Sequence, residues 1–176
     1  MAHDPISIVM TRHERTLLDI LGSHPRPSSL TMFVAFKELC IVLENMHNAG
    51  FVHNDVKPQN ISIKERELST TVTLLDAGHV CQLGEVAYRF SRKYETSAER
   101  EYNRRRKYSW LAPEVYSQCQ PVTRQGDVYS LGYMIHKLLY NKNNDTKEES
   151  LLSKLSKQCL LPEESRPSIS SLYNAL

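Results

Sequence analysis

The sequence has few of the features that mark metal-binding, disulfide-stabilised or membrane proteins. Its four cysteines lie far apart and form no C-x-x-C pair (Cys40, Cys81, Cys119 and Cys159), which argues against a zinc site and against a disulfide framework. No apolar run approaches the length of a membrane span, and residues 1–8 lack a basic region followed by a long apolar one. We therefore expect an intracellular, cytoplasmic protein with free, buried thiols.

An excess of charge of one sign is also absent. The net charge is only +2, so the chain as a whole gives no signal for nucleic-acid binding. A hydrophobic fraction of 40% and a charged fraction of 24% are typical of a soluble globular protein. The length of 176 residues suits one well-buried core, so we predict a single domain over residues 1–176.

The most informative stretch runs from His53 to Asn60 and reads His-Asn-Asp-Val-Lys-Pro-Gln-Asn. It places a carboxylate (Asp55), an ammonium group (Lys57) and an amide (Asn60) within eight consecutive residues. Phosphoryl transfer needs a carboxylate to orient or deprotonate the attacking hydroxyl and a second oxygen ligand to help hold Mg²⁺. The stretch is a candidate catalytic loop, and taken alone it could equally be a polar loop between a helix and a strand.

This stretch resembles the catalytic loop of protein kinases, H-R-D-x-x-x-x-N, at every defined position except Asn54. Further motifs follow in the order of that family: Asp76-Ala77-Gly78, Ala112-Pro113-Glu114, the segment 127–132 and Arg166-Pro167. They are similar to the family's D-F-G, A-P-E, long buried helix and near-terminal arginine. The resemblance covers nearly the whole chain, and it is a resemblance to the large, C-terminal lobe of a kinase.

The resemblance implies a mainly α fold with a small β-hairpin (α+β), without the N-terminal sheet lobe of a complete kinase. It also implies a role for each polar residue of the loop. Asp55 would be the catalytic base, Lys57 would steady the transferred phosphoryl group, and Asn60 and Asp76 would hold Mg²⁺ against ATP. ATP and Mg²⁺ are thus the expected cofactors of an active protein.

Residues 6–10 form a short apolar run after Pro5 and predict a strand. The resemblance places it before the kinase hinge, here residues 11–15, so that Met10 and Thr11 would contact the adenine of ATP. In the family, a glycine-rich loop, a strand lysine and a helix glutamate precede the hinge. Residues 1–9 contain neither glycine nor lysine, so we expect little phosphotransferase activity from this chain alone.

A β-hairpin is predicted from two β-branched runs, Ile61–Ile63 and Thr70–Leu75, that flank a charged connection over residues 64–68. Asn60 precedes the first strand and Asp76 follows the second. Because antiparallel strands run in opposite directions, we expect both residues at the same end of the hairpin. Two oxygen ligands would then lie next to the catalytic loop, a set that suits Mg²⁺.

Helices are predicted from apolar residues at three- and four-residue spacing. One covers residues 30–49 and leads into the catalytic loop, and its His47 is expected to be a surface or capping residue. A second covers residues 127–140, and it is apolar over so wide an arc that most of its sides should be buried. Shorter helices are expected over residues 16–21, 151–161 and 168–176.

Two buried polar contacts follow from the resemblance. The family's counterpart of Asp127 accepts hydrogen bonds from the backbone of the catalytic loop near the histidine, here His53. The counterpart of Arg166 forms an ion pair with that of Glu114, a contact that braces the fold and carries no catalytic meaning.

Residues 76–114 are expected to form a long irregular segment, as the activation segment of kinases does. Between Arg89 and Lys107 lie eight basic residues and three acidic ones. This excess predicts either a solvated, mobile loop or a docking surface for an acidic peptide, a phosphorylated partner or RNA.

Three functional hypotheses remain open. The first is a truncated, pseudokinase-like lobe with little independent activity that binds another kinase or a signalling partner. The second is a fragment of an active kinase that transfers the γ-phosphoryl group of ATP to protein hydroxyls; Lys57-Pro58 resembles serine/threonine kinases, whereas Trp110 resembles tyrosine kinases. The third is an adaptor that binds RNA or acidic proteins through residues 89–107.

Overall fold

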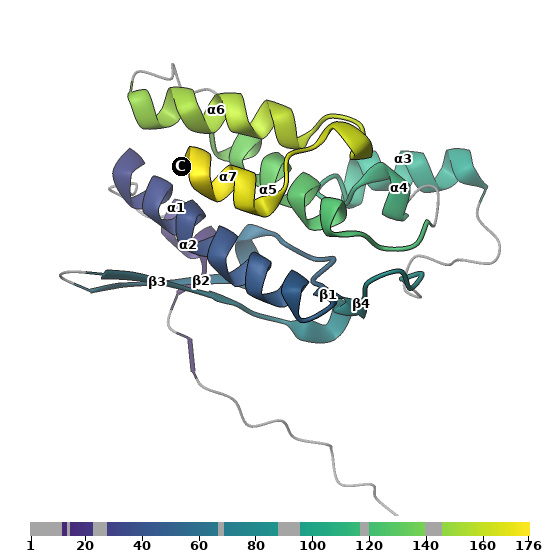
Figure 1. The fold of residues 1–176 in the computed structure, drawn as a ribbon, viewed down its shortest axis with the longest axis horizontal. Helices are drawn as coiled ribbons and strands as arrows, with labels where there is room; N and C mark the ends of the chain where they lie inside the picture. Colours follow the sequence, from purple (N-terminus) through teal and green to yellow (C-terminus); the bar gives the residue numbers. More distant parts are fainter. Residues whose placement is uncertain are drawn as a thin grey trace, which may run out of the picture.

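The fold is taken from a computed structural model that describes residues 12–13, 15–22, 28–66, 69–87, 96–116, 120–139 and 146–176. In these residues helices dominate, and two small two-stranded sheets accompany them (Figure 1). The predicted mainly α fold with a hairpin is therefore observed, with one additional small sheet. The strand predicted over residues 6–10, together with Met10 and Thr11, lies outside the described residues.

Two N-terminal helices begin at the capping signals present in the sequence. Helix α1 (Leu17–Leu21) starts after Thr16, whose side chain and that of Asp19 form a capping box. Helix α2 (Ser29–Asn48) starts after Ser28, whose hydroxyl accepts a hydrogen bond from Thr31 N. The apolar stripe of α2 is buried at Phe36, Leu39, Cys40 and Leu43, as the periodicity predicts.

The predicted hairpin is present and is longer than expected. Strand β2 (Ile61–Arg66) pairs antiparallel with β3 (Ser69–Leu74), so that Ile61 lies opposite Leu74. The charged residues 64–66, which we expected in the connection, belong to β2 because their backbone groups continue the ladder. Helix α2 packs across β3, as Figure 1 shows.

The C-terminal half adds three helices to this layer. Helix α5 (Arg124–Leu139) begins three residues before the predicted start and packs against α6 (Lys147–Cys159), while α7 (Ile169–Ala175) packs against α2 (Figure 1). Their apolar faces join those of α1, α2 and the hairpin in one core. None of the helices in the described segments is long and apolar enough to cross a membrane.

A second, smaller core lies beneath the candidate catalytic loop. Strand β1 (Phe51–Val52), which leads into the loop, pairs antiparallel with β4 (Cys81–Gln82). Helix α4 (Pro113–Tyr116) follows the Ala112 motif. The buried members of this core are Val52, Ala87, Leu111, Ala112, Val115, Tyr116 and Val122. Short 3₁₀ turns complete the fold at Pro58–Asn60 (η1), Ala77–His79 (η2) and Glu163–Ser165 (η4).

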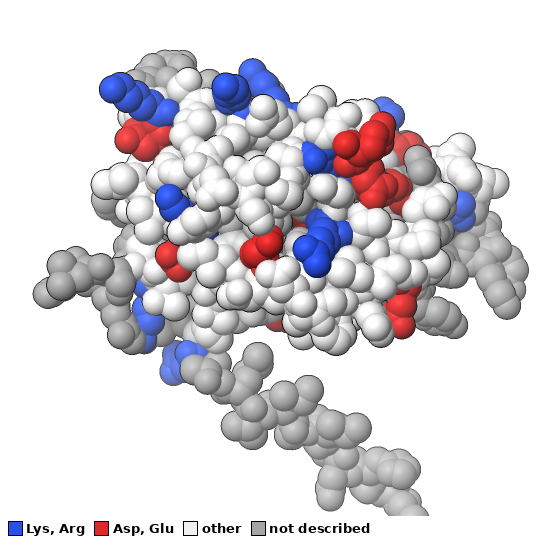
Figure 2. Space-filling model, viewed as in Figure 1, with Lys and Arg blue, Asp and Glu red and all other residues white. Residues whose placement is uncertain are grey.

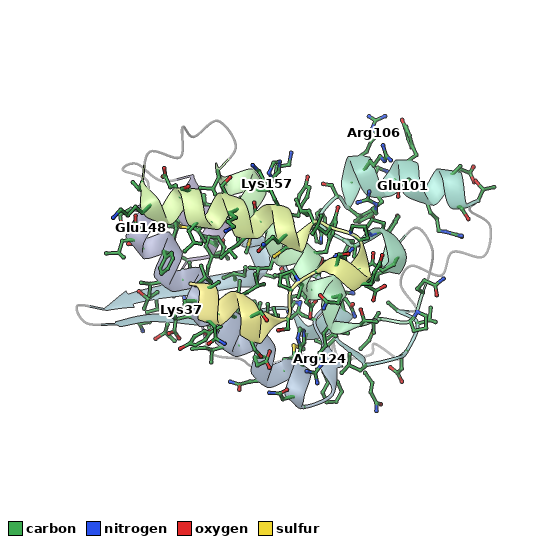
Figure 3. The ribbon with its side chains drawn as sticks, turned by 45° about the horizontal axis from the view of Figure 1, so that its top comes forward. Lys37, Glu101, Arg106, Arg124, Glu148 and Lys157 are labelled. Atoms are coloured by element: carbon green, nitrogen blue, oxygen red, sulfur yellow. The ribbon has the colours of Figure 1, made fainter. Side chains whose placement is uncertain are left out.

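The segment 76–114 is less irregular than the sequence suggests. It contains helix α3 (Ser97–Lys107), which begins at a capping box between Thr96 and Glu99. The hydrogen bonds of this box also lower the pKa of the Glu99 carboxyl. Figure 3 shows Glu101 and Arg106 of α3 at one end of the molecule, away from Lys37 and Glu148. The prediction of a loop is therefore wrong for residues 97–107, and residues 88–95 lie outside the described parts.

Candidate active site

The candidate catalytic loop is fixed to helix α5 by one buried carboxylate. Asp127 Oδ2 accepts a hydrogen bond from His53 N (2.8 Å), and Oδ1 accepts one from Asn54 N (2.9 Å). These are the contacts that the resemblance implies, and they are confirmed. Asn54 adopts a left-handed backbone conformation (φ 59°), which asparagine tolerates better than most residues. The carboxylate therefore sets the path of the backbone at the start of the loop.

His47 contradicts its predicted surface or capping position. Its side chain is fully buried, and Nε2 lies 3.0 Å from Asp127 Oδ2. The physical reason is the carboxylate: a buried charge is costly unless polar partners surround it, and His47 supplies the third partner. Its location at the end of α2 suggested exposure, whereas its partner lies 80 residues further along the chain.

Asp55 is buried and its side chain is held by three donors. Lys57 Nζ donates to Oδ2 (2.7 Å), Asn60 Nδ2 donates to the same oxygen (2.9 Å), and Trp110 Nε1 donates to Oδ1 (3.0 Å). Asn60 Nδ2 also donates to the backbone oxygen of Asp55 (2.9 Å). The carboxylate, ammonium and amide that the sequence groups together do meet in space. The ammonium and amide hold the carboxylate in one orientation.

Lys57 connects the loop to the segment before helix α4. Its side chain is 20% exposed, and Nζ lies 5.1 Å from the centre of the Trp110 ring. This is within the range of a cation–π contact. Lys57 therefore pairs with Asp55 and lies at the solvent edge of the site.

Asn60 and Asp76 lie at the same end of the hairpin, as the antiparallel pairing requires. Leu75 N donates to Asn60 O (2.8 Å), which joins the residue before Asp76 directly to Asn60. Asp76 is exposed, has a left-handed backbone (φ 59°), and accepts a hydrogen bond from Gly78 N (3.2 Å). The backbone positions of Asn60 and Asp76 are therefore close, and their role as a pair of Mg²⁺ ligands stays a prediction.

The chemistry of the residues present fits the Mg²⁺ that the resemblance implies. With Nδ2 of Asn60 donating to Asp55, the other polar atom of that amide is an oxygen, and Asp76 offers a carboxylate. Magnesium takes one or two protein oxygens and completes its shell with water and substrate phosphates. Among the described residues there is no group of three or more His, Cys, Asp or Glu that could hold a metal ion.

Further contacts connect the loop to the residues after the hairpin. His53 Nε2 lies 3.2 Å from Leu75 O, and Asn54 Nδ2 donates to His79 O (3.2 Å). The Cys81 thiol points to the same carbonyl, and burial raises its pKa. These contacts join residues 75–81 to the catalytic loop.

Trp110 contacts the candidate catalytic residue Asp55, and the sequence patterns did not predict this contact. Its backbone oxygen accepts a hydrogen bond from Ser130 Oγ (2.7 Å). The next residue, Leu111, accepts one at its oxygen from Arg104 (3.3 Å), which also donates to Tyr129. Hydrogen bonds to Glu101 raise the pKa of Arg104. The only signal in the sequence was the position of Trp110 before the Ala112 motif, which we interpreted as a mark of substrate class.

The predicted ion pair between Arg166 and Glu114 is confirmed. The Arg166 guanidinium makes two hydrogen bonds to the Glu114 carboxylate and a further one to Gln125 O (2.9 Å). Both side chains are at most 10% exposed. The pair joins helix α4 to the turn before α7 and to the start of α5.

Comparison with known proteins supplies the family context for this geometry. Residues 1–172 match the family model described as a protein kinase domain. The chain is 29% identical over 109 residues to the serine/threonine-protein kinase nekl-2 of Caenorhabditis elegans, covering 62% of this chain and 26% of that protein. It is 28% identical over 162 residues to the beta-adrenergic receptor kinase 1 of Mus musculus, covering 89% of this chain and 21% of that protein. The chain thus spans about a quarter or less of the length of these relatives.

Proposed function

The chain belongs to the protein kinase domain family, and from that premise we propose that it is the large lobe of a serine/threonine kinase. In this role it presents Asp55 to the hydroxyl of a protein substrate during phosphoryl transfer from ATP. The observation that carries the proposal is the assembly of Asp55 with Lys57 and Asn60. A lobe that only binds partners has no evident need for a carboxylate held by an ammonium and an amide.

Each polar residue of the loop has a role in this proposal. Asp55 orients the acceptor hydroxyl and takes its proton. Lys57, 2.7 Å from Asp55, lies where negative charge develops on the transferred group, and a fixed cation stabilises that charge. Asn60 and Asp76 would hold Mg²⁺, which when bound neutralises the phosphates of ATP. The loop reaches this geometry before substrate arrives because Asp127 fixes its backbone.

Serine and threonine are proposed as acceptors on two grounds. Both relatives named above align through much of this lobe, and the printed name of one is a serine/threonine-protein kinase. The Lys57-Pro58 pair resembles that class. Trp110 resembles the tyrosine class, so peptides bearing each hydroxyl belong in the test.

The test is phosphoryl transfer from γ-labelled ATP with Mg²⁺ to peptides that carry serine, threonine or tyrosine. We expect slow labelling of serine and threonine peptides, in line with the low activity expected of this chain alone, and a decrease of about 10²- to 10⁴-fold in Asp55→Asn, because general-base catalysis contributes that much. Glu164→Gln, an exposed carboxylate-to-amide change, is the matched control and should retain activity. Labelling that persists in Asp55→Asn, or that occurs only on tyrosine, would contradict the proposal.

A second candidate function is binding without turnover, to another kinase or to a signalling protein. It is favoured by the exposed end of helix α3, where Tyr102 is 58% exposed and Arg105 is 73% exposed at its side chain. It predicts no labelling of any peptide and stable association with an acidic protein partner.

The adaptor hypothesis for RNA is weakened by the same helix. Arg104 is buried and both Arg104 and Arg105 bond to Glu101, so part of the basic charge is neutralised within α3. On the face shown in Figure 2, basic and acidic groups are interspersed. We therefore do not propose a nucleic-acid function.

A further inference from the structure

The carboxylate of Asp55 is closed to an acceptor by the indole of Trp110. Oδ2 already accepts hydrogen bonds from Lys57 and Asn60, and Trp110 Nε1 lies 3.0 Å from Oδ1. The side chain of Asp55 is 2% exposed. An acceptor hydroxyl must come within about 2.6–3.2 Å of the base to pass its proton, and the burial of Asp55 with the indole N–H at Oδ1 leaves no open approach for it.

Hydrogen bonds hold the backbone around Trp110, so the indole side chain can rotate while residues 109–111 stay in place. Ser130 Oγ donates to Trp110 O (2.7 Å), and the neighbouring Ser109 Oγ donates to the Tyr133 hydroxyl (2.6 Å). Arg104 donates to Leu111 O on the other side. Rotation about the side-chain bonds of Trp110 is therefore the smallest motion that frees Oδ1.

Two attractions hold the indole in the closed position. One is the hydrogen bond to an ionised carboxylate, which is stronger than a bond between neutral groups. The other is the cation–π contact with Lys57, whose Nζ lies 5.1 Å from the ring centre. The Tyr108 ring also packs edge-to-face against the indole, at 5.8 Å between ring centres. The closed state is therefore the favoured one in the absence of an acceptor.

We propose that Trp110 is a gate on Asp55, and that its indole must leave Oδ1 before the serine or threonine hydroxyl of a peptide can bind there. The inference rests on the proposed function, because it assigns Asp55 the role of acceptor base. The acceptor hydroxyl replaces the indole N–H as the donor to Oδ1, so the number of hydrogen bonds to the carboxylate is conserved. Because the Asp55 side chain is 2% exposed, acceptor binding and indole closure compete for the approach to Oδ1, and Trp110 lowers the apparent affinity for every acceptor.

The gate can be observed directly because Trp110 is the single tryptophan of the sequence. Its emission and its quenching by acrylamide report only on this indole. We expect weak quenching in the wild-type protein, and a several-fold larger quenching constant in Asp55→Ala, which removes the acceptor oxygen. Addition of a serine peptide to the wild-type protein should also increase quenching. A constant that is the same in all three samples overturns the proposal.

Kinetics provide a second readout that does not depend on the folding of Asp55→Ala. Trp110→Phe keeps an aromatic ring and removes the N–H that donates to Asp55. We expect the KM for the acceptor peptide to fall about tenfold, because the loss of a hydrogen bond to a charged group changes an equilibrium by at least that factor. The change in KM should exceed any change in kcat. Tyr173→Phe, which removes a hydroxyl from an exposed ring on helix α7, is the control and should leave KM unchanged.

The outcomes separate the gate from the proposed function. Asp55-dependent transfer with an unchanged KM in Trp110→Phe overturns the gate alone. The other case is that Asp55→Ala increases quenching of the indole but neither the wild-type protein nor Trp110→Phe transfers phosphoryl groups. That result overturns the proposed function and with it the role of the gate.

Discussion

At the scale of single residues, Asp127 is the group on which the candidate site depends most. Its fully buried carboxylate accepts hydrogen bonds from two backbone N–H groups of the loop and from His47. Hydrogen bonds to charged groups are worth about 1.5–3 kcal/mol each. Removing the acceptor also leaves the donors buried and unsatisfied, so its loss should affect stability and the loop together.

We predict that Asp127→Asn lowers the free energy of unfolding by about 3 kcal/mol or more, because one carboxylate oxygen becomes an N–H₂ group that faces another donor. Urea-induced unfolding measures the change. Glu164→Gln makes the same chemical change at an exposed position and should alter stability little. Equal unfolding free energies for the two variants would show that Asp127 does not hold the loop.

The side-chain contacts that could be predicted from the sequence are those for which the family motifs specify both partners. The contacts of Asp127 with the loop and of Arg166 with Glu114 are of this kind. The burial of His47 and the contact of Trp110 with Asp55 could not be predicted from local pattern. Their partners lie 80 and 55 residues away in sequence, and helix periodicity carries no information about such distant polar pairs.

At the scale of elements, prediction succeeded where the sequence shows a repeating apolar or β-branched pattern. Helices α2 and α5 have apolar stripes, and both occur close to the predicted bounds. Helix α3 has almost no apolar residues, so the periodicity gave no signal. The Thr96-x-x-Glu99 capping box would have located its start. Strands β1 and β4 have two residues each, which is too short for any alternating pattern.

The contact between helices α5 and α6 depends on the absence of a side chain at Gly132. A Cβ at this position would lie 2.2 Å from Cys159 Cβ and 3.1 Å from Ser156 O. Neither atom belongs to the end of a flexible side chain, so the two helices would have to separate.

We predict that Gly132→Ala lowers the free energy of unfolding by about 1–3 kcal/mol from overpacking, less the gain of up to about 1 kcal/mol that alanine brings to a helix. The melting temperature measures the net effect, and overpacking should prevail. Gly22→Ala is the control, because the nearest atom to its Cβ would be 3.6 Å away, an ordinary contact. A Gly132→Ala protein as stable as the wild type would contradict the close packing.

At the scale of the whole molecule, the functional residues come from four separate parts of the chain. The loop supplies Asp55, Lys57 and Asn60, the end of the hairpin supplies Asp76, and the segment before α4 supplies Trp110; α5 holds the loop through Asp127. The sequence predicted the first two parts because the hairpin is a local element. The family motifs also predicted the contact of the loop with α5 through Asp127, whereas the contact with Trp110 emerges only in the folded chain.

We propose that the loop and the hairpin end form one site for Mg²⁺ and the phosphates of ATP, and a thermal-shift measurement tests this site most directly. At about a hundred times its dissociation constant, a ligand adds about 2.7 kcal/mol to stability, which corresponds to roughly 5–10 °C for a domain of this size. We predict that ATP with Mg²⁺ raises the melting temperature of the wild-type protein and of Glu164→Gln, and that Asp76→Ala loses the part of the shift that requires Mg²⁺. A shift that does not depend on Mg²⁺, or one that is equal in Asp76→Ala, would contradict the account.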